Sequence, residues 1–292
     1  MTLSVLIPTF NYNARALVDS MLKRAQTESV EAEVIVGDDA STSETAWMDE
    51  VESLEDVHII HAEHNLGRAR ICNLMASKAA GQWLLIVDAD ALVPKEFSLK
   101  RYLAAGNEAP VVCGGLYHPS VNPNPADTLR YAYERKADRH RSASLRNLHP
   151  HSQLSTFNLL IRRSVFMAIQ FDEHCTDYGY EDTLFGVQLQ KKGVLIKHID
   201  NPLVHMGLDS NAAFLKKTET AMHTLHALQG KMEGHSRLEN TANRLHQWHL
   251  TGIIKLFYRL TRPLLRRNLL GPHPSLHIFS FYKLGYFLTI QK

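Results

Sequence analysis

The sequence predicts an α/β fold: a mostly parallel, Rossmann-like central sheet flanked by helices, with a helical C-terminal extension. Short apolar runs typical of buried strands alternate with helical patterns over the first hundred residues, as they do in βαβ units. The residues after about 210 show helical patterns instead. The chain has 292 residues and is 45% apolar, which is ample for a sizeable core.

The N-terminal elements follow one another in the order that such a sheet requires. A strand is expected at 3–8, and Asn13 can cap the helix that follows it. A second strand runs from Glu33 to two acids, Asp38 and Asp39. The later expectations are a helix at 44–54, a strand at 57–61, a helix from about residue 67, and a strand at 82–87.

The strand at 82–87 runs directly into Asp88-Ala89-Asp90. An ionised carboxylate is too costly to leave in the core, so these acids must lie where the strand leaves the sheet. The carboxyl ends of parallel strands meet at one edge, so Asp38, Asp39, Asp88 and Asp90 are expected there together. Such acids can bind a hard divalent cation, although an isolated Asp-x-Asp is more often a solvated turn.

The second half of the chain contains a loop, a helix and then further regular structure. Pro and Asn residues predict a loop at 119–125, a helix is expected at 127–141, and the polar, His-rich segment 142–152 is expected to be mobile. Regular structure returns at 156–163. A helix is predicted from Glu181 to Lys192, closed by Gly193.

Charge is unevenly distributed along the chain. The net charge is only +2, but residues 251–292 contain seven Lys or Arg and no Asp or Glu. Apolar residues alternate with these cations at helical spacing, and Pro263 is expected to interrupt the helix. Such a stretch can bind a lipid interface, although a helix that packs on the body or on a second copy fits about as well. No nucleic-acid partner is expected.

Composition also limits where the protein could work. The three cysteines, Cys72, Cys113 and Cys175, are widely spaced and favour reduced thiols in a cytosolic protein. The first residues lack a basic region and enter a strand pattern at once, unlike a signal peptide. No stretch is apolar enough to predict a membrane-spanning helix. We therefore expect a cytoplasmic protein, either free in the cytoplasm or peripheral on the inner face of the cytoplasmic membrane.

Several motifs together resemble glycosyltransferase family 2, whose members have the GT-A fold and use nucleotide sugars. The order of the motifs carries the resemblance, which covers about residues 1–210. The motifs are Val5-Leu6-Ile7-Pro8-Thr9-Phe10-Asn11, Asp38-Asp39-Ala40-Ser41, Asn65-Leu66-Gly67, Asp88-Ala89-Asp90, Phe157-Asn158, Phe171-Asp172-Glu173, Glu181-Asp182 and Pro202-Leu203-Val204-His205. Two positions depart from the pattern: Cys72 stands where an Arg is usual before Asn73, and Ile169-Gln170 replaces a Gly-Gly pair.

The resemblance implies a role for each matching residue. A divalent cation, Mn²⁺ or Mg²⁺, would be held by Asp90 and His205, with Asp88 as a weaker ligand. Asp182 would be the catalytic base and Glu181 its supporting neighbour. The donor nucleotide site would comprise Pro8, Thr9, Phe10, Asp38, Asp39, Asn65, Gly67, Arg68, Arg70, Asn73, Asp88 and Ala89.

More ordinary explanations exist for some of these residues. Glu181 and Asp182 could merely favour a helix N-terminus, and His205 alone would more often be an ordinary histidine beside a strand. The Gly-x-Gly-x-x-Gly sequence of dinucleotide-binding enzymes is absent after the first strand.

The function expected from the resemblance is inverting, metal-dependent transfer of a sugar from a nucleotide diphosphate, with UDP favoured. The acceptor would be a glycan or a polyprenyl-linked saccharide in cell-surface polysaccharide synthesis. Residues 1–210 would form the catalytic domain, with a nucleotide-binding half at 1–115 and an acceptor and catalytic half at 116–210. Residues 211–292 would form the basic extension, and an oligomer is possible. The alternatives are a sugar nucleotidyltransferase and an inactive binding or scaffold protein.

Overall fold

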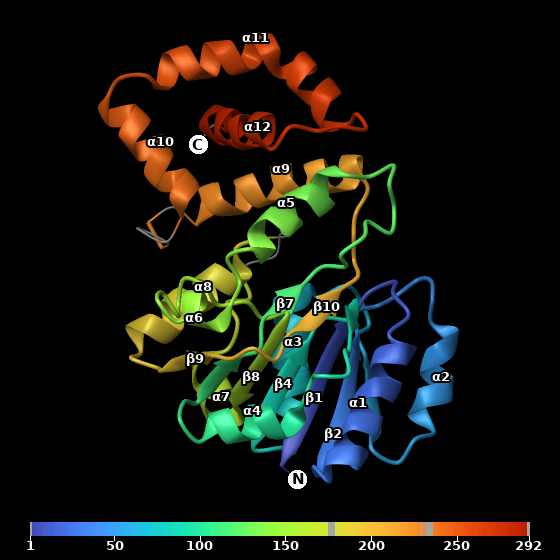
Figure 1. Ribbon diagram of the computed structural model, residues 1–292. Coiled ribbons are helices and arrows are strands. Elements are labelled where there is room, and N and C mark those ends of the chain that lie inside the picture. The colour runs from blue at the N-terminus through green and yellow to red at the C-terminus, as the bar shows by residue number, and fades with distance from the viewer. Residues whose placement is uncertain (1, 175–178, 229, 232–235, 291–292) are drawn as a thin grey trace. The chain divides into compact units, whose positions relative to one another are not determined.

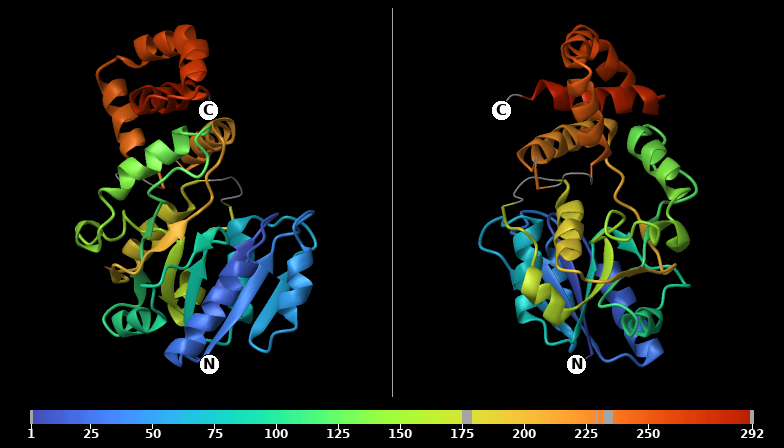
Figure 2. Two further views of the ribbon diagram at one scale, coloured as in Figure 1. Left: turned by 45° about the vertical axis from the view of Figure 1, so that its right-hand side comes forward. Right: turned by 90° about the vertical axis from the view of Figure 1, so that its left-hand side faces the viewer.

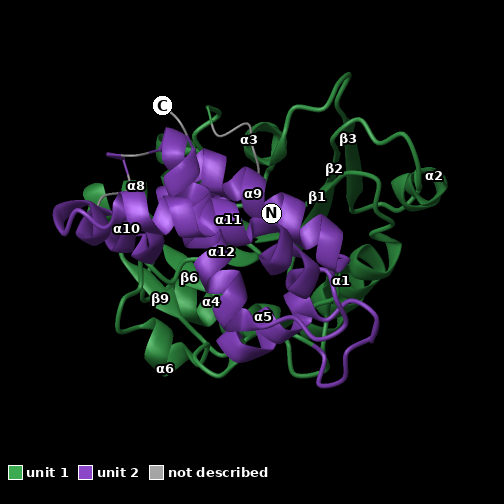
Figure 3. Cartoon of the chain, turned by 90° about the horizontal axis from the view of Figure 1, so that it is seen from above, with its two compact units in different colours: residues 1–118, 138–176, 185–207 green, residues 119–137, 177–184, 208–292 purple. Residues whose placement is uncertain are grey.

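The computed structural model describes residues 2–174, 179–228, 230–231 and 236–290. The chain divides into two compact units (Figure 3). Unit 1 consists of residues 1–118, 138–176 and 185–207. Unit 2 consists of residues 119–137, 177–184 and 208–292, so two short segments of the first two hundred residues group with the C-terminal helices.

Unit 1 is built on a sheet of mixed, mostly parallel strands, seven of them in the described part of the chain (Figure 1). Their order is β3-β2-β1-β4-β8-β6-β9, and β8 runs antiparallel to both of its neighbours. The strands of this sheet are β1 Leu3–Thr9, β2 Ala32–Asp38, β3 Val57–His61, β4 Trp83–Val87, β6 Val111–Cys113, β8 Asn158–Arg162 and β9 Ile196–His198.

Helices cover both faces of this sheet, as the βαβ pattern requires (Figure 2). Helices α1, α2 and α4 pack on one face, and α3, α7 and most of α8 pack on the other. Gly37 in β2 lets α3 approach closely, because a Cβ there would lie 2.7 Å from the Met75 sulfur. The helices are α1 Arg15–Glu28, α2 Ala46–Glu52, α3 Arg68–Lys78, α4 Leu99–Gly106, α6 Ala143–Arg146, α7 Arg163–Ile169 and α8 Glu181–Lys191.

A small second sheet of order β5-β10-β7 also belongs to unit 1. Its strands are β5 Ala91–Leu92, β7 Leu116–Tyr117 and β10 Leu203–His205. Strand β10 pairs antiparallel with β5, where His205 is opposite Ala91. This pairing brings the late His205 next to the segment that leaves β4.

Unit 2 is helical, with a small core of its own. It contains α5 Leu129–Asp138, whose last residue belongs to unit 1, and α9 Asn211–Ala227, α10 Arg237–Gln247, α11 Thr251–Leu269 and α12 Leu276–Thr289. The core of this unit is aromatic and aliphatic, and its buried members are Leu129, Phe214, Leu215, Tyr258, Leu269, Phe279 and Tyr282. No helix in the described residues is long and apolar enough to cross a membrane.

Most of the elements expected from the sequence are confirmed. All five residues of β4 are buried, and α8 ends at Lys191 with Gly193 at φ 66° just beyond it. Two expectations are wrong. The segment 142–152, expected to be mobile, contains α6 and the buried Arg146, whose guanidinium hydrogen-bonds to the carbonyls of Cys113 and Ile199. Pro263 lies inside α11 without ending it.

Candidate active site

The candidate site lies where strand order reverses in the sheet of unit 1. Strand β1 has β2 on one side and β4 on the other. The chain therefore adds β2 and β3 on one side of β1 and then adds the later strands on its other side. Ligands of open α/β sheets bind outside the carboxyl ends of strands at such a switch point. Thr9, Asp38 and Val87 end the three strands there, and the expected acids of the first half lie at or within three residues of the ends of β2 and β4.

Asp38 and Asp39 hold the loops at this edge. Asp38 accepts a hydrogen bond from the Ser41 N–H at 3.0 Å and lies 3.1 Å from Nδ1 of His61. Both oxygens of Asp39 accept backbone N–H groups, from Leu66 at 2.6 Å and from Gly67 at 3.0 Å. These bonds shape the turn that leads into α3. Both carboxylates are buried and already engaged within the chain.

The loop after β1 is tied to the loop after β2. Thr9 donates to the Tyr12 carbonyl, and the Asn11 side chain accepts the N–H groups of Thr42 and Ser43. Pro8 pairs in register with Gly37 of β2. Phe10 is half exposed, so its ring presents an aromatic surface beside these loops.

The start of α3 faces the second group of acids. Arg68 donates to Asp88 at 2.6 Å and to the Thr156 carbonyl at 3.3 Å. Arg68 is therefore already paired with one acid of the Asp-x-Asp sequence. Ala89 is the half-buried residue between Asp88 and Asp90.

Asn73, Arg70 and Asn65, also expected at the donor, make contacts within the chain. The buried Asn73 exchanges hydrogen bonds with the backbone of Phe171 and donates to Glu173 at 3.0 Å. The exposed Arg70 lies 3.6 Å from Glu173. The Asn65 amide donates to the Asp39 carbonyl at 3.3 Å. Asn73 thus holds the 171–173 segment against α3, and a donor role for it stays a prediction.

Asp90 and His205, far apart in sequence, meet in the structure. His205 Nε2 lies 3.0 Å from Asp90 Oδ2. Gly207 makes room for the acid, because a Cβ at that position would lie 1.8 Å from Asp90 Oδ2. The carboxylate of Asp90 and burial of the ring also raise the pKa of Tyr12, with burial the larger cause.

A chain of hydrogen bonds continues behind His205. His205 Nδ1 lies 3.0 Å from His118 Nε2, and His118 Nδ1 lies 3.1 Å from Asp138. Burial alone would raise the pKa of Asp138, but hydrogen bonds from His118 and the charges of His118 and Arg141 lower it to about 2. Asp138 is therefore ionised, and it accepts a hydrogen bond from His118 Nδ1.

The ionised carboxylate of Asp138 fixes a proton on His118 Nδ1. When His118 Nε2 carries no second proton, it accepts from His205 Nδ1, and a singly protonated His205 then directs the lone pair of Nε2 at the Asp90 carboxylate. In that arrangement two acceptors 3.0 Å apart repel each other unless a proton or a cation lies between them.

The donor set fits a hard divalent cation that completes its shell with substrate oxygens. A carboxylate and an imidazole suit Mn²⁺ or Mg²⁺, and Mg²⁺ sites commonly use one or two protein ligands with phosphates and water. Over the described ranges, no group of three or more His, Cys, Asp or Glu side chains is arranged to hold a metal ion. Only Asp90 and His205 of the three expected ligands are therefore brought together, since Asp88 is bound by Arg68.

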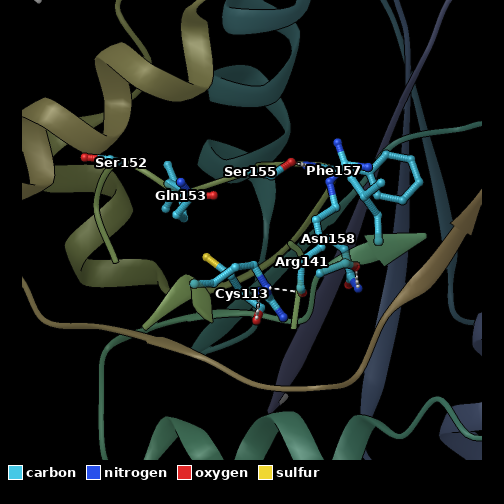
Figure 4. Close-up of a pocket in the computed structure, with 11 residues that line it drawn as sticks. Cys113, Arg141, Ser152, Gln153, Ser155, Phe157 and Asn158 are labelled. Atoms are coloured by element: carbon cyan, nitrogen blue, oxygen red, sulfur yellow. Dashed lines mark hydrogen bonds between the residues drawn. The ribbon is translucent and has the colours of Figure 1, made fainter. Parts of the chain in front are cut away.

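A small pocket of about 170 Å³ lies beside this pair in unit 1 (Figure 4). Phe157 lines it, and its ring packs edge-on to the His205 ring at 5.0 Å between centroids. Figure 4 shows Phe157 and Asn158 on one side of the pocket and Ser152 and Gln153 on the other. Its polar lining of Arg141, Ser152, Gln153 and Ser155 can hydrogen-bond a small hydroxylated group.

Glu181 and Asp182 lie in the first turn of α8, in a segment assigned to unit 2. Glu181 accepts the Gly179 N–H at 3.0 Å, which orders the entry to the helix. A larger cavity of about 800 Å³ in unit 2 includes Gly179, Tyr180 and Thr183 in its lining. Burial raises the pKa of Tyr180 to about 12, with contributions from Tyr133 and Glu239, so its phenol is a hydrogen-bond donor.

Four residues that sequence reasoning did not assign prove central to this geometry. His118 and Asp138 orient His205, Asn11 joins two loops, and Tyr12 is near Asp90. Asn11 had one sequence signal, since it is the last residue of the motif that begins at Val5, although it was given no role of its own. The other three have no distinguishing spacing, because only the folded chain brings them to the site.

Comparison of the sequence with known protein families identifies the family of this chain. The family model described as Glycosyl transferase family 2 matches residues 4–170, more than half of the chain. A curated protein, Glycosyltransferase GlyG of Streptococcus pneumoniae serotype 4, is 28% identical over 119 residues. That match covers 40% of this chain and 39% of the relative, so the chain spans about two fifths of the relative's length.

Solved structures show the same fold over nearly the whole chain. S. aureus TarS 1-349 superposes with a TM-score of 0.53 and 19% identity, covering 98% of this chain and 89% of that one. Its complex with UDP-GlcNAc gives a TM-score of 0.52 at 19% identity, covering 98% of this chain and 90% of that one. At such low identity the likeness concerns the fold alone.

Proposed function

This chain belongs to glycosyltransferase family 2 and has a GT-A-like fold, and from that premise we propose that it transfers a sugar from a uridine diphosphate donor to a saccharide acceptor. The observation that carries the proposal is the Asp90–His205 pair at the switch point of the sheet, 3.0 Å apart. UDP-GlcNAc, the ligand of the S. aureus TarS structure, is the first donor to test.

The proposed donor site follows the carboxyl edge from β2 to β4. Phe10 stacks on the uracil, because its half-exposed ring offers an aromatic face. Asp38 and Asp39 use their remaining oxygen lone pairs for the base and ribose while their other lone pairs hold the loops. Arg68 and the first turn of α3 bind the diphosphate, where helix N–H groups favour anions. Pro8, Thr9, Asn65, Gly67 and Ala89 shape the walls, and Arg70 and Asn73 support α3.

Asp90 and His205 are proposed to hold Mn²⁺ or Mg²⁺, and Asp88 contributes only if Arg68 moves to the diphosphate. A bound divalent cation supplies positive charge that offsets the charge on the departing diphosphate. His118 and Asp138 keep the lone pair of His205 Nε2 directed at Asp90.

Asp182 is the proposed general base. It would take the proton from the attacking acceptor hydroxyl, and a single base implies direct displacement with inversion at the sugar. Glu181 would support it by ordering the turn at Gly179. The cavity of unit 2 that includes Tyr180 and Thr183 is the proposed acceptor region, because those residues flank Asp182 in the chain.

The proposed acceptor is a glycan or a polyprenyl-linked saccharide used in cell-surface polysaccharide synthesis. The proposed setting is the cytoplasm, with the chain attached to the inner face of the membrane. The polar lining of the unit 1 pocket supports a saccharide ligand, and the cation-rich C-terminal sequence supports the membrane attachment.

Donor selection tests the proposal directly. Hydrolysis and transfer would be measured with UDP-, GDP- and dTDP-sugars, with Mn²⁺ and with EDTA. Turnover of a UDP-sugar that stops with EDTA is the expected result. Selective use of a guanosine donor would contradict the uridine assignment, and turnover undiminished by EDTA would contradict the cation.

An inactive scaffold is the remaining competing function. It predicts that UDP binds but that no donor is consumed with any acceptor fraction. A nucleotidyltransferase is disfavoured by the family match. It would release diphosphate when the donor is replaced by a nucleoside triphosphate and a sugar 1-phosphate.

A further inference from the structure

Helix α11 has two opposite apolar faces, and only one of them is used inside unit 2. Tyr258 and Leu269 on the first face are buried, and Leu265 packs with them against the core of unit 2. The helix also lies beside α12, and the Tyr258 and Tyr282 rings pack at 5.6 Å between centroids (Figure 1). This face is sufficient to hold α11 in the unit.

The second face is a stripe of large exposed side chains. At about 100° per residue, its positions fall within a sector of roughly 100° on one side of the helix. The exposed stripe consists of Ile253, Leu256, Phe257, Leu260 and Leu264, each between 55% and 71% exposed. Trp248 and Leu250 precede it and Leu270 follows it, all three exposed as well. Contiguous apolar surface of this kind marks an interaction site more often than a bare monomer surface.

The charges around the stripe indicate which partner covers it. Arg259, Arg262 and Arg267 on the same helix are exposed. Arg266 pairs with Glu219, but residues 251–292 contain no acid of their own to neutralise the others. An apolar face with exposed cations complements a surface that is apolar inside and anionic outside.

A second copy of the chain is a poorer fit to the same stripe. A two-fold contact would place the same patch of both copies face to face. The arginines of the two helices would then approach each other with no acid on α11 or α12 between them. Such a contact would desolvate like charges, whereas an anionic lipid surface would pair them.

We propose that the exposed stripe of α11 binds an anionic lipid bilayer, with the helix axis parallel to the membrane plane. Ile253, Leu260 and Leu264 enter the acyl boundary, and Arg259 and Arg267 contact the anionic headgroups. Trp248 lies at the interface, where its amphipathic ring is favoured. This inference deepens the membrane attachment proposed above, and it does not depend on the donor, the cation or the acceptor.

Vesicle binding by the full chain tests the proposal. Flotation would be compared with vesicles of phosphatidylcholine alone and with vesicles containing a third phosphatidylglycerol. Binding to the anionic vesicles only, weakened at high salt, is the expected result. Trp248 provides a second signal, because Trp47 and Trp83 are buried and only Trp248 is exposed. Its emission should shift to the blue on binding, and the shift should disappear in Trp248→Phe.

Two matched triple variants separate this surface from general apolar exposure. The test variant is Ile253→Gln/Leu260→Gln/Leu264→Gln, which spares Phe257 because its ring packs on Phe281. The control is Val121→Gln/Leu148→Gln/Leu195→Gln, whose side chains are exposed to a similar degree. The test variant should bind anionic vesicles on the order of 100-fold more weakly, and the control should bind as wild type.

Equal vesicle binding by both triple variants would overturn the proposal. It would also be overturned if the wild-type chain bound no vesicles and the test variant changed its mass in light scattering, since a second copy would then cover the stripe. Circular dichroism and thermal unfolding of each variant ensure that a loss of binding is not a loss of fold.

Discussion

His198 and His205 lie on the consecutive strands β9 and β10 of unit 1, and both are buried, yet their ring nitrogens have opposite situations. His198 Nδ1 accepts from Arg146 at 2.8 Å, and its Nε2 donates to the Pro150 carbonyl at 2.9 Å. His205 Nδ1 lies 3.0 Å from His118 Nε2, and its Nε2 lies 3.0 Å from the Asp90 carboxylate rather than from a backbone carbonyl.

The difference separates a structural histidine from the proposed metal ligand. Both nitrogens of His198 are matched by the chain itself, so it needs nothing from outside the fold. His205 is held by equally fixed neighbours in a position that only a proton or a cation can satisfy. Burial and a hydrogen-bond network alone therefore do not identify a functional histidine, whereas an acceptor fixed opposite an acceptor does.

The largest difference between His198 and His205 should appear when each imidazole ring is removed separately. His205→Ala should lower transfer by about 10³-fold, because it removes a proposed ligand of the charge-offsetting cation, and it should cost less stability than His198→Ala, because the buried group that loses a partner is the His118 ring and not a guanidinium. His198→Ala should instead destabilise the fold by roughly 1–3 kcal/mol, because it removes one of the acceptors of the buried Arg146 guanidinium and leaves the Pro150 carbonyl without its donor. Steady-state kinetics and urea unfolding would be measured on both variants. Equal loss of stability in the two would contradict the distinction.

A second variant separates cation binding from proton transfer. Asp182→Asn should reduce the transfer rate by about 10²–10⁴-fold, because the acceptor hydroxyl loses its general base. UDP affinity in the presence of Mn²⁺, measured by calorimetry, should stay near the wild-type value. Glu181→Gln serves as the control and should have a much smaller effect. Unchanged turnover in Asp182→Asn would show that the base is another group.

The two histidines also differ in what pH does to the fold. Burial lowers the pKa of His198 to about 4, and the charge of Arg146 acts in the same direction against the hydrogen bond to Pro150. The folded state therefore favours the neutral ring. The neutral His198 ring therefore contributes fully to the free energy of unfolding above its unfolded-state pKa of about 6.5. This contribution is lost as pH falls from 6.5 toward 4.

Urea unfolding at pH 7 and pH 4.5 measures this contribution. Between pH 7 and pH 4.5 the free energy of unfolding of the wild-type protein should fall by roughly 2–3 kcal/mol because of His198. The free energy of unfolding of His198→Asn should change correspondingly less over the same interval. Asp138 has a folded-state pKa of about 2 and an unfolded-state pKa of about 3.9, so its contribution to the free energy of unfolding is lost only below about pH 3.9. It therefore does not affect the difference in stability between pH 7 and pH 4.5. The same slope in both proteins would contradict this account of His198.

The smallest expected effect concerns the residues behind His205. His118→Ala should weaken Mn²⁺ binding about 10-fold or somewhat more, because the His205 ring loses the partner that fixes its tautomer. The paramagnetic spectrum of free Mn²⁺ measures this affinity without any turnover. His118→Asn, whose amide can still accept from His205 Nδ1, should recover part of the loss. No difference between wild type and His118→Ala would indicate that the neighbour is dispensable.

Much of unit 1 could be predicted from sequence because its signals are local. Strands such as Trp83–Val87 are continuous apolar runs, and the acids that follow them can only lie at the sheet edge. The two wrong expectations have a common cause, since tertiary contacts override local preference. Carbonyls from distant loops accept hydrogen bonds from the buried Arg146. Helix α11 continues through Pro263 because residues before and after it, Tyr258 and Leu269, pack in the core of unit 2.

The candidate site was predictable only in part, for a similar reason. Asp90 and His205 could be named because motif order carries them, but their pairing depends on β10 meeting β5. His118 and Asp138 gave no signal, because a hydrogen-bond chain between side chains twenty and more residues apart has no sequence period. The exposed stripe of α11 was likewise ambiguous, since periodicity marks apolar faces without saying which one packs.

A crystal structure with Mn²⁺ and UDP tests the central claim most directly. Anomalous scattering would locate the metal regardless of the rest of the map. The account predicts a manganese peak about 2.1–2.3 Å from both Asp90 Oδ2 and His205 Nε2, with diphosphate oxygens completing its shell. A peak on Asp38 and Asp39 instead, or UDP bound with no metal at Asp90 and His205, would contradict it.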